Sequence, residues 1–334
     1  MNTTIRCAVF GVGRLGMVHA ENIAQKIQGA ELVYVVASRP ERAKKAADEL
    51  GAKKWTTDPD VVFEDDSIDA VILVTPTSTH YDLIKKAAKH NKQIFVDKPI
   101  TETVEQAKEV SALINETGVH CMVGFMRRFD PAYLEAKKRI EAGDIGKPLY
   151  FKGMSRDPGS PPEAVIKNSG GIFLDLCIHD FDIARFLMGS EVKSVTSLGS
   201  VQVHPFMHTY QDVDQAISFL EFESGAAADI EGSRNSTYGY DIRGEVVGTD
   251  GAMQIGTIRK ENVTLLNAKG STYENIPVFQ SKFQEAFLIE MNHFIKCIQN
   301  NEKPLVNEVD GLASLQVAAA ATEAFLQKSK ITIA

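Results

Sequence analysis

An aspartate and a histidine with helical spacing give this sequence its clearest chemical signal. Asp175 and His179 lie in a mostly apolar run that follows Gly170 and Gly171. In a helix, residues four apart project from one face, one turn apart, so this carboxylate and this imidazole are expected to be neighbours. Burying such groups without partners is costly. The run is therefore either a helix that carries a reactive site or a core helix whose histidine pairs with its own aspartate.

A lysine at the end of another apolar run adds a cation to these two groups. Lys98 follows the strand-like segment 93–96 and precedes Pro99. An imidazole has a pKa near neutral pH and suits a general base, and an ammonium group can stabilise a developing negative charge. A lysine in this position is either a surface charge or a site cation, and the rigid proline beside it favours the site.

A glycine-rich loop near the N-terminus predicts how such groups are positioned. Residues 5–10 form a buried strand-like run, and residues 15–28 have a helical pattern. Between them stands G-x-G-x-x-G, in which the glycines permit a tight turn, close approach to a pyrophosphate and close helix–strand packing. The helix N-terminus would face the phosphates. The predicted loop residues are Gly11, Val12, Gly13, Arg14, Leu15 and Gly16.

Strands and helices then alternate up to residue 123. Such alternation predicts a parallel, doubly wound α/β sheet, which binds ligands at the carboxyl ends of its strands. Thr75, Pro76, His80 and Lys98 follow strand ends and are expected near the cofactor. The expected elements are strands 31–37, 70–74, 93–96 and 120–123, and helices 40–50, 80–89 and 104–117.

The residues after the second strand leave the choice of cofactor open. NAD-binding chains usually have an acidic residue there to bind the ribose 2′-hydroxyl, whereas this chain has Ser38 and Arg39. This pair could receive the 2′-phosphate of NADP. Alternatively, Ser38 could bond the ribose of NAD while Arg39 stacks on the adenine.

The remaining chain predicts a different kind of domain. Strand-like runs separated by turn residues, with helices between and after them, indicate an α+β domain with a large open, mostly antiparallel sheet. We predict a dinucleotide-binding domain over residues 1–124 and a substrate-binding and oligomerisation domain over 125–334. The expected elements are helices 130–142, 174–188, 281–299 and 311–328, and strands 146–154, 192–203, 213–222, 226–233, 242–248 and 252–255.

Three motifs in this order resemble the Gfo/Idh/MocA oxidoreductases, a family of NAD(P)-dependent sugar and polyol dehydrogenases. They are the Gly11–Gly16 loop, Asp97-Lys98-Pro99, and Asp175-x-x-x-His179-Asp180. The segments 124–130 and 238–241 look most like the inositol 2-dehydrogenase branch, which acts on myo- or scyllo-inositol. The resemblance implies a dimer or homotetramer assembled through the open sheet. It favours NAD, although Ser38 and Arg39 depart from the acidic residue typical of that branch.

With this resemblance, the three reactive residues have definite roles. His179 would remove the proton of a secondary hydroxyl, Lys98 would stabilise the alkoxide, and Asp175 would bind a substrate hydroxyl or orient Lys98. A polyol also needs further hydrogen-bonding partners. The candidates are Arg127, Asp157, Tyr238 and Tyr240. Each has a structural alternative: Arg127 could form an ion pair between domains, Asp157 could be a turn residue, and the two tyrosines could pack on strands.

Composition narrows the remaining alternatives. The net charge of −8 argues against a nucleic-acid partner, and no apolar stretch is long enough to span a membrane. The N-terminus has no signal-peptide core and the four cysteines are widely spaced, so we expect a cytoplasmic protein. A metal enzyme using Asp175, His179 and Asp180 lacks a second ligand motif, and we expect no metal. Dehydrogenation of another sugar (an aldose) and a non-catalytic NAD(P)-binding sensor stay open.

Overall fold

The computed structural model describes residues 4–333. Residues 1–3 and 334 lie outside the described residues. Residues 1–3 belong to the predicted domain 1–124, and residue 334 belongs to the predicted domain 125–334. The chain divides into two compact units. The first comprises residues 4–129 together with Glu285–Leu312, and the second comprises Asp130–Gln284 together with residues 313–333.

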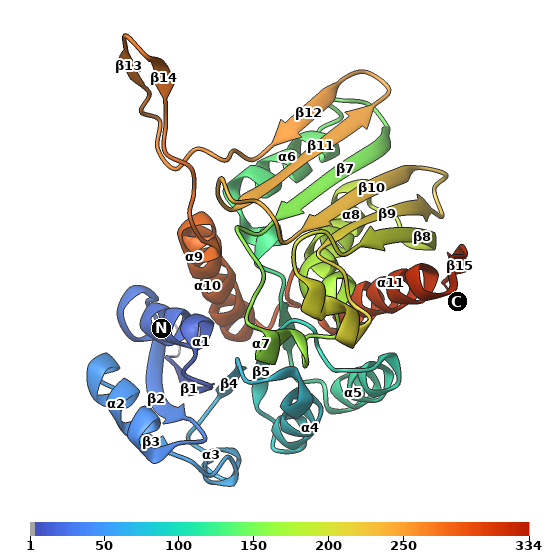
Figure 1. Ribbon diagram of the computed structural model, residues 1–334. Helices are drawn as coiled ribbons and strands as arrows, with labels where there is room; N and C mark the ends of the chain where they lie inside the picture. The colour runs from blue at the N-terminus through green and yellow to red at the C-terminus, as the bar shows by residue number, and fades with distance from the viewer. Residues whose placement is uncertain (1–3, 334) are drawn as a thin grey trace. The chain divides into compact units, whose positions relative to one another are not determined.

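The first unit contains a six-stranded parallel sheet with the strand order β3-β2-β1-β4-β5-β6 (Figure 1). The chain leaves β3 and returns to the other side of β1, so the order reverses between β1 and β4. In such sheets, the carboxyl ends at this reversal form the ligand site. The predicted parallel, doubly wound α/β sheet, known as a Rossmann fold, is confirmed. The strands are β1 (Ile5–Phe10), β2 (Ala30–Val36), β3 (Lys54–Thr56), β4 (Ala70–Leu73), β5 (Gln93–Asp97) and β6 (Cys121–Gly124).

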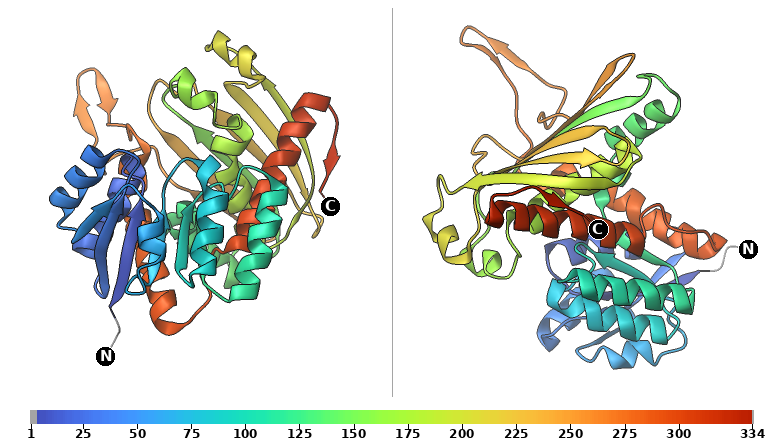
Figure 2. Two further views of the ribbon diagram at one scale, coloured as in Figure 1. Left: turned by 90° about the horizontal axis from the view of Figure 1, so that it is seen from below. Right: turned by 90° about the vertical axis from the view of Figure 1, so that its right-hand side faces the viewer.

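Helices cover this sheet, which explains why β1, β4 and β5 are almost wholly apolar and buried. α4 and α5 pack against each other along the sheet (Figure 2). α10 comes from a distant part of the sequence and joins the unit through Phe294, whose ring centroid lies 5.9 Å from that of Phe95 in β5. The helices are α1 (Arg14–Glu21), η1 (Asn22–Lys26), α2 (Pro40–Leu50), α3 (Asp60–Phe63), η2 (Thr77–Thr79), α4 (His80–Lys89), α5 (Val104–Thr117), η3 (Met126–Phe129) and α10 (Gln284–Asn300).

The second unit is built on a seven-stranded sheet with the order β12-β11-β7-β10-β9-β8-β15. Its central pair, β7 and β10, is parallel, and its other pairs are antiparallel. This confirms the predicted mostly antiparallel sheet. The strands are β7 (Pro148–Arg156), β8 (Val192–Ser200), β9 (Gln215–Phe222), β10 (Ala227–Ser233), β11 (Asp241–Gly248), β12 (Ala252–Ile255) and β15 (Ile331–Thr332).

One face of this sheet carries helices and the other exposes side chains. α8 packs on β7 and β10, while Leu198, Ile217 and Phe219 on β8 and β9 are exposed. A separate hairpin of β13 (Leu265–Asn267) and β14 (Gly270–Thr272) extends from the unit (Figure 1). The helices are α6 (Pro131–Glu141), α7 (Glu163–Ile166), η4 (Phe173–Cys177), α8 (Ile178–Met188), η5 (Pro205–Tyr210) and α9 (Phe279–Lys282), and α11 (Glu308–Gln327) begins in the first unit and continues into the second.

Candidate active site

Each glycine of the loop between β1 and α1 has its own structural reason. Gly11 has a φ of +92°, and a Cβ there would lie 2.3 Å from the carbonyl oxygen of Val74. A Cβ on Gly16 would lie 2.0 Å from the carbonyl oxygen of Gly11, so α1 packs directly on the loop. A Cβ on Gly13, the N-cap of α1, would meet nothing within 4 Å. The open space therefore lies at the N-terminus of α1, where the first-turn N–H groups favour a phosphate.

The other predicted cofactor residues of this region are accessible at the same edge of the sheet. Val12 and Leu15 are half-buried, and Arg14 is exposed at the first position of α1. Ser38 and Arg39 are exposed just after β2, where Arg39 is the N-cap of α2. The glycine loop and this exposed pair fit a dinucleotide, with the pyrophosphate at α1 and the adenosine end towards β2.

A buried histidine joins the loops that follow β4 and β5. His80 is 1% exposed, and its Nδ1 and Nε2 lie 2.9 and 3.0 Å from the carbonyl oxygens of Pro99 and Thr75. Burial lowers the pKa of His80, and the two carbonyl contacts oppose this shift, because a neutral ring has one N–H and can donate to only one of the two carbonyls. Pro76, which follows Thr75, is exposed. His80 thus lies between the loops that carry Thr75 and Pro99 and contacts both.

A second carboxyl group stands beside the Asp97-Lys98-Pro99 turn, and sequence reasoning missed it. Lys98 is half-buried just after β5. Asp97 lies on the same face of β5 as Phe95, and Glu290 lies on the same face of α10 as Phe294. Because the rings of Phe95 and Phe294 are in contact, Glu290 is brought close to Asp97. Glu290 is 1% exposed, and burial, followed by the charge of Asp97, raises its pKa well above the usual range.

The helix that carries Asp175 and His179 begins differently from the predicted regular α-helix. Phe173–Cys177 is a π-helical turn, and the α-helix starts at Ile178. Such turns occur frequently at functional sites. Asp175 is half-buried in the π-turn, and His179 is 8% exposed in the first turn of α8. The next two acids are structural, because Asp180 accepts a hydrogen bond from Ser155 and Asp182 accepts one from Ser314 and pairs with Arg185.

The structure adds Arg234, which the sequence reasoning did not single out. Its Nη2 donates a hydrogen bond to Oδ2 of Asp175 at 3.0 Å, although the two residues are 59 positions apart in the chain. The arginine is fully buried, with 0% of its surface exposed. Asp175 thus has a cationic partner within its own unit. The run Gly232-Ser233-Arg234 carries no periodic signal that would have revealed this pair.

The four predicted substrate residues lie in different settings. Arg127 is buried in η3 of the first unit. Asp157 is half-buried after β7, with its backbone N–H bonded to the carbonyl of Ser233. Tyr240 is 7% exposed, and its ring packs edge-on against the ring of Phe283. Tyr238 is 47% exposed, and its hydroxyl donates to Oδ2 of Asp241 and accepts from Arg156, so it belongs to a polar network at the sheet surface.

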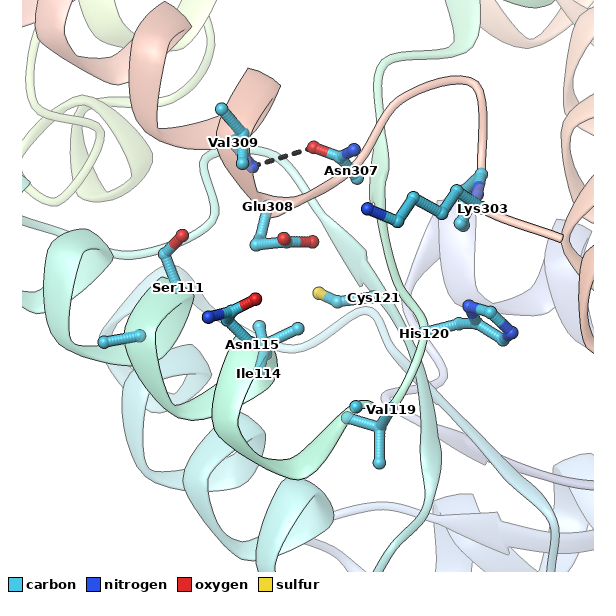
Figure 3. A pocket seen from close by; sticks show the side chains of 13 residues that line it. Ser111, Ile114, Asn115, Val119, His120, Cys121, Lys303, Asn307, Glu308 and Val309 are labelled. Carbon is cyan, nitrogen blue, oxygen red and sulfur yellow. Dashed lines mark hydrogen bonds between the residues drawn. The ribbon is translucent and has the colours of Figure 1, made fainter. Parts of the chain in front are cut away.

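A cavity of about 450 Å³ lies in the first unit away from these residues (Figure 3). It is bordered by the end of α5, the start of β6, the chain before α11 and the first residues of α11. The carboxyl of Glu308 and the thiol of Cys121 point into it, and burial raises the pKa of both. This cavity is at the amino end of β6, opposite the edge where dinucleotides bind. We therefore do not assign the chemistry to it.

Residues 4–333 contain no group of three or more histidine, cysteine, aspartate or glutamate side chains arranged to hold a metal ion. Over the same range, every helix is too short or too polar to span a bilayer.

The two units together define a class of protein. A parallel sheet with this strand order, a glycine loop at the N-terminus of α1 and a second unit carrying acid–base residues are the parts of a dinucleotide-dependent oxidoreductase. Residues 5–125 match the family description "Oxidoreductase family, NAD-binding Rossmann fold", and residues 137–333 match "Oxidoreductase family, C-terminal alpha/beta domain". The chain belongs to the Gfo/Idh/MocA oxidoreductase family, as its motifs predicted.

Individual relatives resemble the chain over nearly its whole length. It is 54% identical to the scyllo-inositol 2-dehydrogenase (NAD(+)) of Bacillus subtilis, over 97% of this chain and 95% of the relative. It is 36% identical to the myo-inositol 2-dehydrogenase of Thermotoga maritima, over 98% of each. A similar solved structure is the crystal structure of scyllo-inositol dehydrogenase from Lactobacillus casei with bound NAD(H) and scyllo-inositol. The two chains share 32% sequence identity, the match covers 99% of each, and the TM-score is 0.94.

Proposed function

We propose that this protein is an NAD-dependent inositol 2-dehydrogenase and that scyllo-inositol is its preferred substrate. The observation that carries the proposal is the 54% identity, over almost the entire chain, to a relative named for this reaction. The next relatives are named for inositol as well, including the myo isomer. Scyllo-inositol is therefore the first candidate, and myo-inositol the second.

NAD is the proposed cofactor rather than NADP. The glycine loop leaves space at the N-terminus of α1, and a relative is named for NAD(+). Ser38 and Arg39 are compatible with NAD if the serine hydroxyl bonds the ribose and the guanidinium stacks on the adenine. When bound, NAD supplies an acceptor for the hydride that leaves the carbinol carbon.

The chain's own residues would supply the remaining chemistry. His179 acts as the general base that takes the hydroxyl proton onto its imidazole. Lys98 holds a positive charge beside the oxygen as it becomes an alkoxide. Asp175, whose Oδ2 is held by Arg234, accepts a hydrogen bond from a substrate hydroxyl. Arg127, Asp157 and Tyr240 are retained as candidates for the other hydroxyl groups.

Tyr238 is the weakest of the proposed substrate residues. Its hydroxyl already donates to Asp241 and accepts from Arg156. A Tyr238→Phe variant is therefore expected to keep the wild-type KM for inositol, whereas Tyr240→Phe is expected to raise it. Equal effects of both substitutions would contradict this ranking.

A spectrophotometric assay at the absorbance band of reduced nicotinamide tests the proposed function. Purified protein is assayed with scyllo-inositol, myo-inositol and glucose, each with NAD and with NADP. The highest kcat/KM is expected with scyllo-inositol and NAD. A preference for glucose would indicate an aldose dehydrogenase, and tight NAD binding without turnover of a broad sugar panel would indicate a sensor.

We also propose that the protein is a cytoplasmic homo-oligomer, a dimer or a tetramer, that assembles through the open face of its second sheet. Leu198 pairs with Ile217 across β8 and β9, and the neighbouring Phe219 is also exposed, which leaves an apolar patch uncovered. The double variant Ile217→Glu/Phe219→Glu is expected to lower the mass measured by light scattering. A wild-type mass equal to the monomer would contradict assembly.

A further inference from the structure

The side chain of Arg234 is a buried cation with few partners. It follows β10 and is fully buried, and its hydrogen bond to Asp175 uses only Nη2. Nε and Nη1 make no hydrogen bond with any described residue. Placing a guanidinium in the interior is costly unless ion pairing and hydrogen bonds offset the lost hydration. Core stability therefore does not explain why an arginine occupies this position.

Local packing sets this arginine against the π-turn. A Cβ on Gly232 would lie 2.5 Å from Sγ of Cys177, so the missing side chain lets η4 approach β10 closely. Residues two positions apart in an extended strand point to the same face of the sheet, so Arg234 faces η4 as Gly232 does. Asp175 lies in the same turn of η4 and meets the guanidinium there.

A second carboxyl group, Asp212, faces this pair from the loop after η5. Its Oδ1 accepts hydrogen bonds from the backbone N–H groups of Ile172 and Val213, both at 2.8 Å, and so fixes the start of η4. Burial raises the pKa of Asp212, and Arg234 opposes that rise. Arg234 thus interacts electrostatically with two acids, and Asp175 is the one that it contacts directly.

We propose that Arg234 is a positioning residue that holds the Asp175 carboxylate in one orientation and in its ionised form for binding a substrate hydroxyl. The inference rests on the proposed function, in which Asp175 contacts the polyol. A guanidinium bonded to Oδ2 restricts the rotation of the carboxylate, and its charge favours the anion. The ionised form accepts hydrogen bonds on both oxygens, and those bonds are stronger than the ones a neutral carboxyl group accepts.

Steady-state kinetics of the NAD-loaded enzyme with scyllo-inositol test this role. Arg234→Met is expected to raise the KM for inositol roughly 10- to 100-fold, as loss of a charge-assisted hydrogen bond predicts, and to leave the KM for NAD unchanged. The acid limb of the kcat/KM profile is expected to move to higher pH. Asp212 is a titratable group that interacts electrostatically with both members of the pair. The Asp214 carboxylate is bonded elsewhere, to the backbone N–H groups of residues 202–204. His179 lies four positions after Asp175, in the first turn of α8.

Two further variants separate positioning from a general structural effect. Arg234→Lys keeps the charge but not the length and direction of the Nη2–H donor, so it should keep the acid limb and raise the KM for inositol several-fold. Arg185 is the matched control, because it is buried in the same unit and bonded to Glu191 at 2.6 and 2.7 Å. Arg185→Gln is expected to lower the melting temperature while the KM for inositol and the pH profile stay unchanged.

A further measurement, an NMR titration, does not depend on catalytic turnover. The carboxyl carbons of 13C-labelled aspartate are titrated by NMR, with Asp175→Asn used to assign the Asp175 signal. The pKa of Asp175 should rise in Arg234→Met, and an unchanged pKa together with an unchanged KM would overturn the proposal. If the wild type oxidises no inositol, the proposed function fails, and the NMR titration alone still decides whether Arg234 holds the charge.

Discussion

The glycine loop allows a sharp test, because two of its glycines differ in what a methyl group would meet. A methyl group on Gly13 would have open space around it, and the φ of −75° there is one that alanine adopts readily. A methyl group on Gly16 would lie 2.0 Å from the carbonyl oxygen of Gly11. Gly13→Ala should therefore disturb only a bound pyrophosphate, whereas Gly16→Ala must push α1 away from the loop.

The structure sets the expected magnitudes. Gly13→Ala should leave the free energy of unfolding of the apo protein unchanged or raise it by about 0.4–1 kcal/mol, because alanine reduces the entropy of the unfolded chain. Gly16→Ala should lower it by about 1–3 kcal/mol through overpacking. If Gly13→Ala weakens NAD binding tenfold, NAD at 100 times the wild-type Kd should stabilise this variant by about 1.3 kcal/mol less than the wild type.

Thermal or urea unfolding with and without NAD, together with NAD titration by calorimetry, measures both effects. The expected pattern is a stable Gly13→Ala apo protein that has lost about half of its NAD-dependent stabilisation. Gly13→Val should show the same defect more strongly, since a branched side chain fills more of the space. Wild-type affinity for NAD in both Gly13 variants would refute the placement of the pyrophosphate at α1.

The remaining predictions concern acid–base groups. His179→Asn should lower kcat roughly 100- to 10,000-fold with NAD affinity intact, and wild-type turnover would exclude it as the base. Lys98→Met should lower kcat roughly 100- to 1,000-fold at neutral pH, as checked in the same assay. Because burial raises the folded-state pKa of Glu290, the stability that its neutral form provides is lost as pH rises from about 4.5 towards that pKa. Glu290→Gln should remove this loss, by up to about 1.4 kcal/mol for each pH unit in that window, and an equal pH slope in both proteins would contradict it.

Local sequence patterns predicted much of the secondary structure in this chain. The helices over residues 40–50, 80–89 and 104–117 and the first strand have the bounds that were read from the sequence. Two of these helices show a local cause: α2 begins at a proline and α5 is capped by Thr103, and a glycine follows the last turn of both. These signals act within a few residues, so one sequence is enough to detect them.

Other features depended on contacts between distant segments. Nothing along the chain indicated that α10 joins the first unit, where it brings Glu290 beside Asp97. The regular helix predicted from residue 174 begins as a π-turn. The hydroxyl of Tyr238, a candidate substrate residue, accepts a hydrogen bond from Arg156, 82 positions away in the chain. Periodicity does not encode such pairings, since they arise when whole elements pack.

The amino-acid order was enough to predict the cofactor-binding loop and the fold class and to single out Lys98, Asp175 and His179 as candidates. Glycine spacing, strand–helix alternation and side-chain chemistry are all local properties. Only the tertiary structure showed which side chains surround those residues, such as Arg234 beside Asp175. The bond between Arg234 and Asp175 exists because Gly232 lets β10 approach η4, and no pattern along the chain records that approach.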